Sequence, residues 1–300
     1  MALLFVCCDL NNEPGLNIQM PSKSEITLKG DALRFDSIKA FQETMNYLNS
    51  LPIEKLEEYE NQLGFANSLR SRLMVSDSEE ISDEVLKINV KDFRLATVVN
   101  SKGIYYIGNV IHKITDSFEF AMENGNEETL LNAERDDFKV DGLVKHKITG
   151  FTSAIPEENG RFSGKESIII PIANDPSGNS KRVTMEAWSR NYLTYASNGV
   201  NLITESFRRT CGLCSRKWRD SAVQYMKVNS VSRHYPSVGG SGLWLILNNQ
   251  EEAYSYHNIQ KVIDYVAGFG VWIDTDYIDC TYTTIDDANV RRDNFVHWVN

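Results

Sequence analysis

Two cysteines separated by two residues, Cys211 and Cys214, have the spacing used in thiol–disulfide chemistry. Four basic residues flank the pair: Arg208, Arg209, Arg216 and Lys217. Their positive charges would lower the pKa of a thiol, as a redox-active cysteine requires. However, the residues before Cys211 indicate a hairpin rather than a βαβ unit, and a zinc site would need two further ligands. We therefore expect turn residues or a small local disulfide, with a redox pair and a zinc site as the alternatives.

Two other segments contain residue types that could do chemistry. Gly239-Gly-Ser-Gly-Leu243 lacks the second glycine of the serine-hydrolase pattern G-x-S-x-G, because Leu243 occupies that position. Asp274, Asp276 and Asp279 are close together, but the calcium-loop pattern with its final glutamate is absent. We expect the first segment to be a turn and the second an exposed acidic loop, with a bound calcium ion as the alternative. No catalytic residue, cofactor or metal is assigned.

Aromatic and cationic residues lie close together in 188–195, where they could form a binding surface. Tryptophan and tyrosine rings stack against sugars, and an arginine binds anions. Together with the basic residues beside the cysteine pair, the candidate surface comprises Trp188, Arg190, Tyr192, Arg208, Arg209, Arg216 and Lys217. The alternative, which we favour, is an ordinary sheet with one buried face, the Trp and Tyr side chains inside and the Arg side chains outside.

Charge is unevenly distributed along the chain. The 300 residues carry a formal net charge of −10, which disfavours a nucleic acid as the partner. Residues 181–233 nevertheless hold ten Lys or Arg and three Asp or Glu, a net charge of +7, so the remainder carries −17. This asymmetry could hold an anionic partner. No run of eighteen apolar residues is present, so no transmembrane helix is expected.

The first ten residues resemble the end of a bacterial lipoprotein signal. The run Met1-Ala-Leu-Leu-Phe-Val-Cys-Cys-Asp-Leu10 is mostly apolar, but it lacks the basic start of a complete secretory signal. Cys8 is the expected lipid-attachment residue, because Cys7 is small enough to precede the cleavage site. A buried strand over 2–6 is the alternative. We expect residues 1–25 to be a signal remnant and tether that anchors the protein to a membrane of the cell envelope.

The chain that follows predicts helices first. Asp36 can cap a helix, and apolar residues then recur at spacings of three and four over 38–48. The pattern resumes over 53–63 and stops at Gly64, which is a typical helix terminator. The short break between the two stripes predicts a helical hairpin. A third, shorter turn of helix is expected within 65–73.

From about residue 95 the periodicity becomes that of strands. Gly108-Asn109 joins two short apolar runs in a predicted hairpin, and 126–134 predicts one more helix. Asn198-Gly199 is the strongest hairpin signal, because an Asn-Gly pair supplies the positive φ of a type I′ turn. The expected fold is α+β, an N-terminal helical hairpin with antiparallel sheet followed by a β-rich, sandwich-like C-terminal half. We place an α+β domain at 26–155 and a β-rich domain at 156–300.

Several short motifs occur in a recognisable order along the chain. They are 31–41 (DALRFDSIKAF), Gly64-Phe65-x-x-Ser68-Leu-Arg70, Val99-Asn-Ser-Lys-Gly103, Ile107-Gly108, Glu186-Ala-Trp188, Asn191-Tyr192, Tyr195-Ala-Ser-Asn-Gly199 and Trp218. This order resembles a family of uncharacterised secreted lipoproteins of gut Bacteroidetes, a domain of unknown function. The resemblance covers most of the chain and transfers no activity. It supports lipid attachment at Cys8 and implies that Cys211 and Cys214 are incidental.

The expected function is therefore binding without catalysis. A lipid-anchored envelope protein would bind a glycan, a cell-wall component or a protein partner. One alternative is an envelope enzyme, acting through Cys211 and Cys214 or as an unrecognised hydrolase. Another is a cytosolic interaction module whose basic region 181–233 contacts an acidic partner, in which case binding would weaken steeply with salt.

Overall fold

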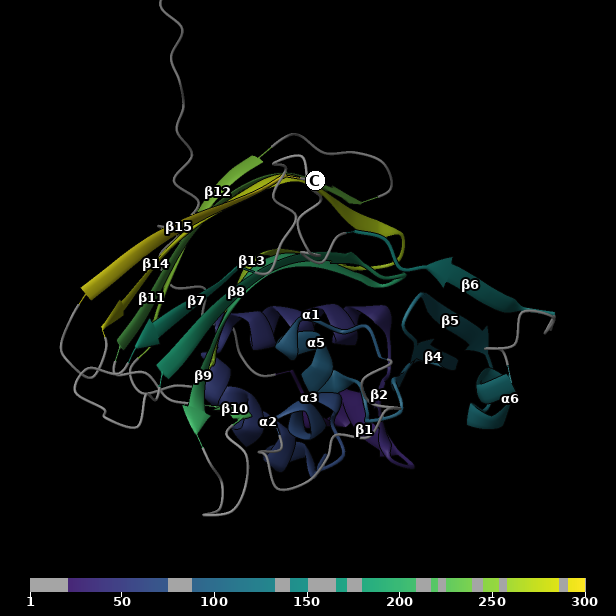
Figure 1. Ribbon diagram of the computed structural model, residues 1–300. Coiled ribbons are helices and arrows are strands. Elements are labelled where there is room, and N and C mark those ends of the chain that lie inside the picture. Colours follow the sequence, from purple (N-terminus) through teal and green to yellow (C-terminus); the bar gives the residue numbers. More distant parts are fainter. Residues whose placement is uncertain are drawn as a thin grey trace, which may run out of the picture.

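A computed structural model describes ten stretches of the chain: 21–74, 88–132, 141–150, 166–171, 180–208, 217–220, 225–238, 245–253, 258–285 and 291–299. It confirms the α+β class, with helices concentrated in the N-terminal part and strands in the C-terminal part (Figure 1). The predicted boundary between residues 155 and 156 and the glycine-rich segment 239–243 lie outside the described residues.

The predicted helical hairpin is present near the N-terminus. Its first helix, α1 (Ile38–Ser50), is capped by Ser37 rather than by Asp36, because the Ser37 hydroxyl accepts a hydrogen bond from the N–H of Ala40. The second helix ends as predicted at Gly64, which has a φ of +67°. The other short helices are η1 (Lys23–Glu25), η2 (Ile53–Lys55), α2 (Leu56–Leu63), α3 (Leu69–Leu73), α5 (Phe93–Val98) and α6 (Glu127–Asn132).

The first sheet has the strand order β1-β2-β3-β4-β5-β6. Its strands are β1 (Ile26–Lys29), β2 (Ala32–Phe35), β3 (Ile104–Ile107), β4 (Val110–Ile114), β5 (Phe118–Glu123) and β6 (Leu143–Lys147). Strands β2 and β3 are parallel because α1, α2, α3 and α5 lie between them in the chain, and the other neighbours are antiparallel. The β3–β4 turn lies where Gly108-Asn109 predicted it, and Gly108 has a φ of +58°.

Both faces of the first sheet are covered, which explains why β3 is apolar throughout. On one face Phe35 and Tyr105 belong to the main hydrophobic core, which the helices also form. On the opposite face Tyr106 and Ile111 pack with Leu130 of α6. Side chains of alternating strand positions therefore enter two different cores.

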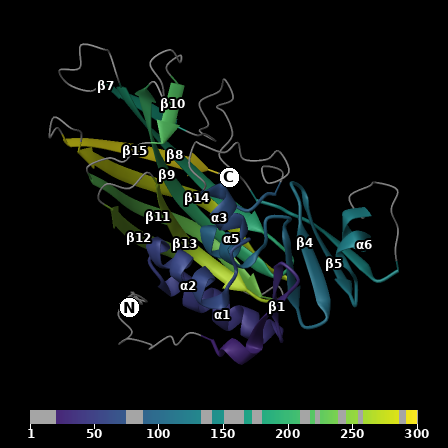
Figure 2. The same ribbon diagram turned by 90° about the horizontal axis from the view of Figure 1, so that it is seen from below.

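Two antiparallel sheets form the rest of the protein. The second sheet has the order β10-β9-β8-β7, with β13 also paired to β9, and the third has the order β12-β11-β14-β15. Their strands are β7 (Glu166–Pro171), β8 (Ser180–Asn191), β9 (Tyr195–Arg208), β10 (Lys217–Asp220), β11 (Tyr225–Val238), β12 (Leu245–Ala253), β13 (Asn258–Ala267), β14 (Val271–Ile285) and β15 (Arg291–Val299). Figure 1 shows the second sheet between the helices and the third sheet, and Figure 2 shows the helices in front of both sheets. This stacking confirms the sandwich-like C-terminal half.

The hairpin predicted at Asn198-Gly199 is wrong. Asn198 and Gly199 lie inside the continuous strand β9, and the chain reverses earlier, between Tyr192 and Tyr195. The N–H of Tyr192 donates to the carbonyl of Tyr195 at 2.8 Å in that turn. A local turn preference was therefore overridden by tertiary contacts.

The contacts of the Asn-Gly pair show why it belongs in a strand. The Asn198 Oδ1 atom accepts the N–H of Asp264 at 3.0 Å, at a bulge of β13, and its Nδ2 atom donates to Thr275 Oγ1 at 3.1 Å. A Cβ atom on Gly199 would lie 2.7 Å from the ring of Trp188 and closer still to a backbone carbonyl of β13. Glycine is present here because two neighbours approach closely, not because a turn needs positive φ.

The acidic loop predicted at 274–279 is also wrong, because these residues belong to β14. The side chain of Asp274 is exposed, whereas Asp276 forms an ion pair with Arg233 of β11. Within the part of the chain that the structure describes, no cluster of three acidic, histidine or cysteine side chains could hold a metal ion.

Candidate functional site

Segment 88–93 lies across the face of the second sheet that is turned towards the helices. The side-chain oxygen of Asn89 accepts a hydrogen bond from Arg190 Nε at 3.0 Å. The backbone carbonyl of Asn89 accepts one from the Tyr192 hydroxyl at 2.7 Å. Gln260 of β13 binds the backbone of the same segment through two hydrogen bonds of 2.7 Å. The polar and aromatic side chains of this face thus bind the protein's own chain.

These contacts correct the expected aromatic and cationic surface. The exposed fractions of Trp188, Arg190 and Tyr192 are 0%, 8% and 1%. Burial lowers the pKa of the Arg190 guanidinium and raises the pKa of the Tyr192 phenol. Trp188 and Tyr192 face inwards as the alternative interpretation predicted, and Arg190 does so as well. The physical reason is that 88–93 occupies the space that a ligand would need.

The other predicted site residues are not brought into this region by anything that the structure describes. Arg208 of β9 and Lys217 of β10 are partners in the backbone register of these two strands. Five predicted site residues lie outside the described residues: Cys8, Arg209, Cys211, Cys214 and Arg216. The lipid attachment and the role of the cysteine pair therefore stay predictions.

A carboxylate and an imidazole lie together beneath the turns that begin β9 and β14. Glu119 Oε1 accepts the Tyr105 hydroxyl at 2.6 Å and lies 2.9 Å from His112 Nδ1. The other oxygen, Oε2, accepts the N–H of Leu193 at 2.6 Å, and the Tyr105 hydroxyl also lies 2.7 Å from Thr194 Oγ1. We call Tyr105, His112, Glu119, Leu193 and Thr194 the buried polar network.

The buried polar network is closed to solvent. Tyr105, His112 and Glu119 are each 0% exposed, and the rings of Tyr105 and His112 stack with centroids 4.8 Å apart. Burial raises the pKa of Tyr105 well above its ordinary value, so the phenol stays protonated and donates to the carboxylate. A carboxylate–imidazole pair of this kind orients a catalytic base in some enzymes. Here it joins β3, β4 and β5 to the turn before β9, which is a structural role.

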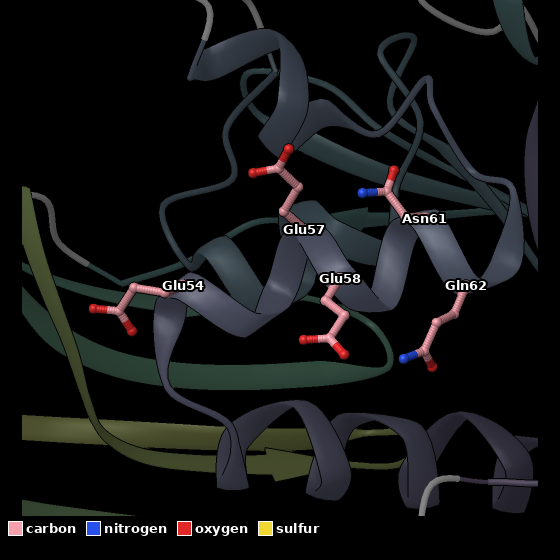
Figure 3. A pocket seen from close by; sticks show the side chains of 5 residues that line it. All are labelled: Glu54, Glu57, Glu58, Asn61 and Gln62. Carbon is pink, nitrogen blue, oxygen red and sulfur yellow. The ribbon is translucent and has the colours of Figure 1, made fainter.

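A hollow of about 520 Å³ runs along α2 and is lined by Glu54, Glu57, Glu58, Asn61 and Gln62. Figure 3 shows that these side chains diverge, with Glu57 and Asn61 on one side of the helix and Glu58 and Gln62 on the other. Glu58 also forms an ion pair with Lys55, which lowers the pKa of the Glu58 carboxyl. Glu54, Glu57 and Glu58 are exposed, so this is a solvated acidic face, and its side chains do not converge on a ligand.

A second pocket, of about 420 Å³, lies where β8, β14 and the chain after β6 meet. We call it the edge pocket, and its lining is Thr149, Gly150, Ser189, Asn191, Trp272, Ile273, Asp274 and Thr275. The pairing of β14 with β15 begins at Tyr277, and the edge pocket lies beside the residues of β14 that come before it. This volume is within the range of about 300–1,000 Å³ typical of small-molecule sites.

Side-chain hydrogen bonds hold the edge pocket in shape. The side-chain amide of Asn191 pairs with the backbone of Ile273, as the backbone of a neighbouring strand would. Its Oδ1 accepts the N–H of Ile273 at 2.7 Å, and its Nδ2 donates to the Ile273 carbonyl at 3.1 Å. Thr275 Oγ1 donates to Ser189 Oγ at 3.1 Å and accepts from Asn198. A Cβ atom on Gly150 would lie 2.3 Å from the Ser189 carbonyl, so only glycine allows the chain to approach β8 this closely.

The wall that faces solvent has an aromatic ring and a carboxylate. Val271, Ile273 and Thr275 are buried, whereas Trp272 is partly exposed and Asp274 is exposed. Because alternate residues of a strand share a face, the side chains of Trp272 and Asp274 emerge on the same side of β14. The edge pocket therefore combines an indole, a carboxylate and hydroxyl groups.

Sequence reasoning missed this combination. Asp274 was noted for its charge and Asn191 for its place in a motif, but Trp272 was not singled out. The alternation of apolar and exposed residues over 271–275 was the available signal. Thr149, which follows β6, and Ser189 of β8 join the pocket from segments distant in sequence, and no local pattern could have indicated them.

Cys280 is the free cysteine among the residues described here, and it is buried. Burial raises the pKa of its thiol, which keeps it protonated and unreactive. The described helices are all too short or too polar to span a bilayer.

Comparisons with known proteins add little about activity. No family model matches the chain, and no curated protein matches it. A crystal structure of a DUF4848 family protein from Bacteroides thetaiotaomicron aligns with 92% of this chain and 100% of its own length, at 10% sequence identity and a TM-score of 0.23. With this TM-score the match carries no argument about fold or activity.

Proposed function

We propose that the protein is a non-catalytic binding protein of the cell envelope and that the edge pocket binds a carbohydrate. The observation that carries this proposal is the meeting of the partly exposed Trp272 with hydroxyl and amide groups at the edge of β14. Sugars present apolar C–H faces and many hydroxyls, so they are bound by aromatic rings beside hydrogen-bonding groups.

The preformed shape of the edge pocket supports this proposal. Asn191, Ser189 and Thr275 are held by the hydrogen bonds given above, and Ser189 and Thr275 are each 1% exposed. Groups that are already ordered lose little conformational entropy when a ligand binds. Thr149 is exposed and its hydroxyl accepts from Asn191 Nδ2 at 3.4 Å, so its own proton can be donated to a sugar oxygen.

A binding role without catalysis is supported by the placement of the ionisable groups. The carboxylate–imidazole pair of the buried polar network is closed to solvent, and Asp274 is the one charged residue among those described as lining the edge pocket. Glycoside hydrolysis commonly requires two carboxyl groups flanking the scissile bond. The described lining of the edge pocket has one.

Trp272→Ala is expected to weaken carbohydrate binding by tenfold or more, because the stacking surface is removed. An array of defined oligosaccharides would identify a ligand, and calorimetry would compare its affinity for the wild-type and variant proteins. Phe269→Ala is a matched control, since Phe269 is a half-exposed aromatic residue of the preceding turn that does not line the pocket. A wild-type protein that binds no glycan, or equal affinity in the Trp272 variant, would overturn the proposal.

Attachment to the envelope through Cys8 is part of the same proposal. Its support is the apolar run that ends in two cysteines at the start of the sequence. The mass of the native N-terminal peptide from producing cells is expected to show an acylated Cys8. An unmodified peptide that begins at Met1 would contradict the anchor and leave the carbohydrate proposal to be judged on the pocket alone.

A further inference from the structure

The charge inside the edge pocket distinguishes it from a site for a neutral sugar. Among the described residues that line it, Asp274 alone is ionisable and none is basic. The neighbouring Asp276 is neutralised by Arg233, whereas the described residues provide no ion-pair partner for Asp274. Among the residues that the structure describes, Asp274 is thus an exposed carboxylate without a counter-ion at the pocket.

The position of this carboxylate relative to the indole is specific. Trp272 and Asp274 are two residues apart on the same face of β14, a separation of about 7 Å along the strand. A ligand that stacks on the indole can therefore also reach the carboxylate. A cationic group is attracted both by the face of an aromatic ring and by a carboxylate.

The remaining walls restrict the cation further. The Asn191 and Ser189 side chains are already paired within the protein, whereas Thr149 is exposed and offers a hydroxyl that can pair with a ligand hydroxyl. A quaternary ammonium group offers no N–H donors, whereas an amino sugar has both hydroxyls and a protonated amine. The net charge of −10 also favours the approach of a cation over that of an acidic sugar.

We propose that the edge pocket selects amino sugars with a free, protonated amine, through stacking on Trp272 and an ion pair with Asp274. This inference rests on the proposed carbohydrate binding and names the class of sugar. Because the carboxylate is exposed, the ion pair adds a modest gain, about fivefold in affinity, that decreases with salt.

The test compares two probes that differ in the amine alone, the tetramers of glucosamine and of N-acetylglucosamine, below the pKa of the amine. The wild-type protein is expected to bind the glucosamine tetramer about fivefold more tightly at low salt. Asp274→Asn is expected to remove this preference, so that both tetramers bind with equal affinity, and Trp272→Ala is expected to weaken binding of both. Asp276→Asn is the matched control, because Asp276 is outside the pocket and should leave the preference intact.

The outcomes separate the two proposals. Equal affinity for both tetramers, or a preference that persists in Asp274→Asn, would overturn the amino-sugar inference and leave carbohydrate binding standing. If the protein bound other glycans through Trp272 but bound neither tetramer, the amino-sugar inference would also be overturned and carbohydrate binding would stand. Absence of binding to every glycan tested would overturn both.

Discussion

Glu119→Ala is expected to lower the free energy of unfolding by about 3–5 kcal/mol, which is the cost of removing one partner of a buried ionisable pair. The carboxylate accepts from the Tyr105 hydroxyl and the Leu193 N–H and lies 2.9 Å from His112 Nδ1. Alanine would leave these groups without their acceptor in a place that excludes water. Urea unfolding followed by circular dichroism would measure the loss.

Two further variants make this prediction specific. Glu119→Gln keeps the side-chain size and one acceptor oxygen, so a smaller loss of about 1–3 kcal/mol is expected. Glu123 is exposed at the end of the same strand, and Glu123→Ala should change the stability by no more than about 0.5 kcal/mol. If Glu119→Ala proved as mild as Glu123→Ala, the network would not hold the turn before β9 as described.

Arg70→Ala is expected to have an effect of similar size, about 3–5 kcal/mol, on the packing of α2 against α3. Arg70 Nε donates to Glu60 Oε1 at 2.9 Å and a second guanidinium nitrogen binds the other oxygen, so the pair is bidentate. Ser68, the N-cap residue of α3, donates its hydroxyl to the same carboxylate at 2.6 Å. Glu60 and Arg70 are 3% and 7% exposed, so the variant would leave a buried charge without its partner.

The double variant Glu60→Met with Arg70→Met tests this explanation, because it removes both charges. Its loss of stability is expected to be smaller than that of Arg70→Ala, since no unpaired charge remains. Arg72 is an exposed arginine of the same helix, and Arg72→Ala serves as the surface control, with a change of about 0.5 kcal/mol or less. A double variant that loses as much stability as Arg70→Ala, or more, would contradict the argument.

The sequence alone predicted the elements that depend on local periodicity and on turn chemistry. The apolar stripe of 38–48 became α1, and Gly64 ended α2 because glycine adopts positive φ without strain. The hairpin at Gly108-Asn109 was found for the same reason. In each case the residues that decide the structure are neighbours in the chain.

The tertiary structure decided what local patterns could not. Asn198-Gly199 has the chemistry of a turn, but its amide satisfies a bulge of β13 and its missing Cβ makes room for the ring of Trp188. Arg190 and Tyr192 resemble a ligand-binding surface, but segment 88–93 covers them. The edge pocket brings Thr149, Ser189 and Trp272 together from separate segments of the chain. The stacking of sheets, which involves residues far apart in the chain, determines which face of a strand contacts another segment. A short stretch of sequence therefore cannot predict that contact.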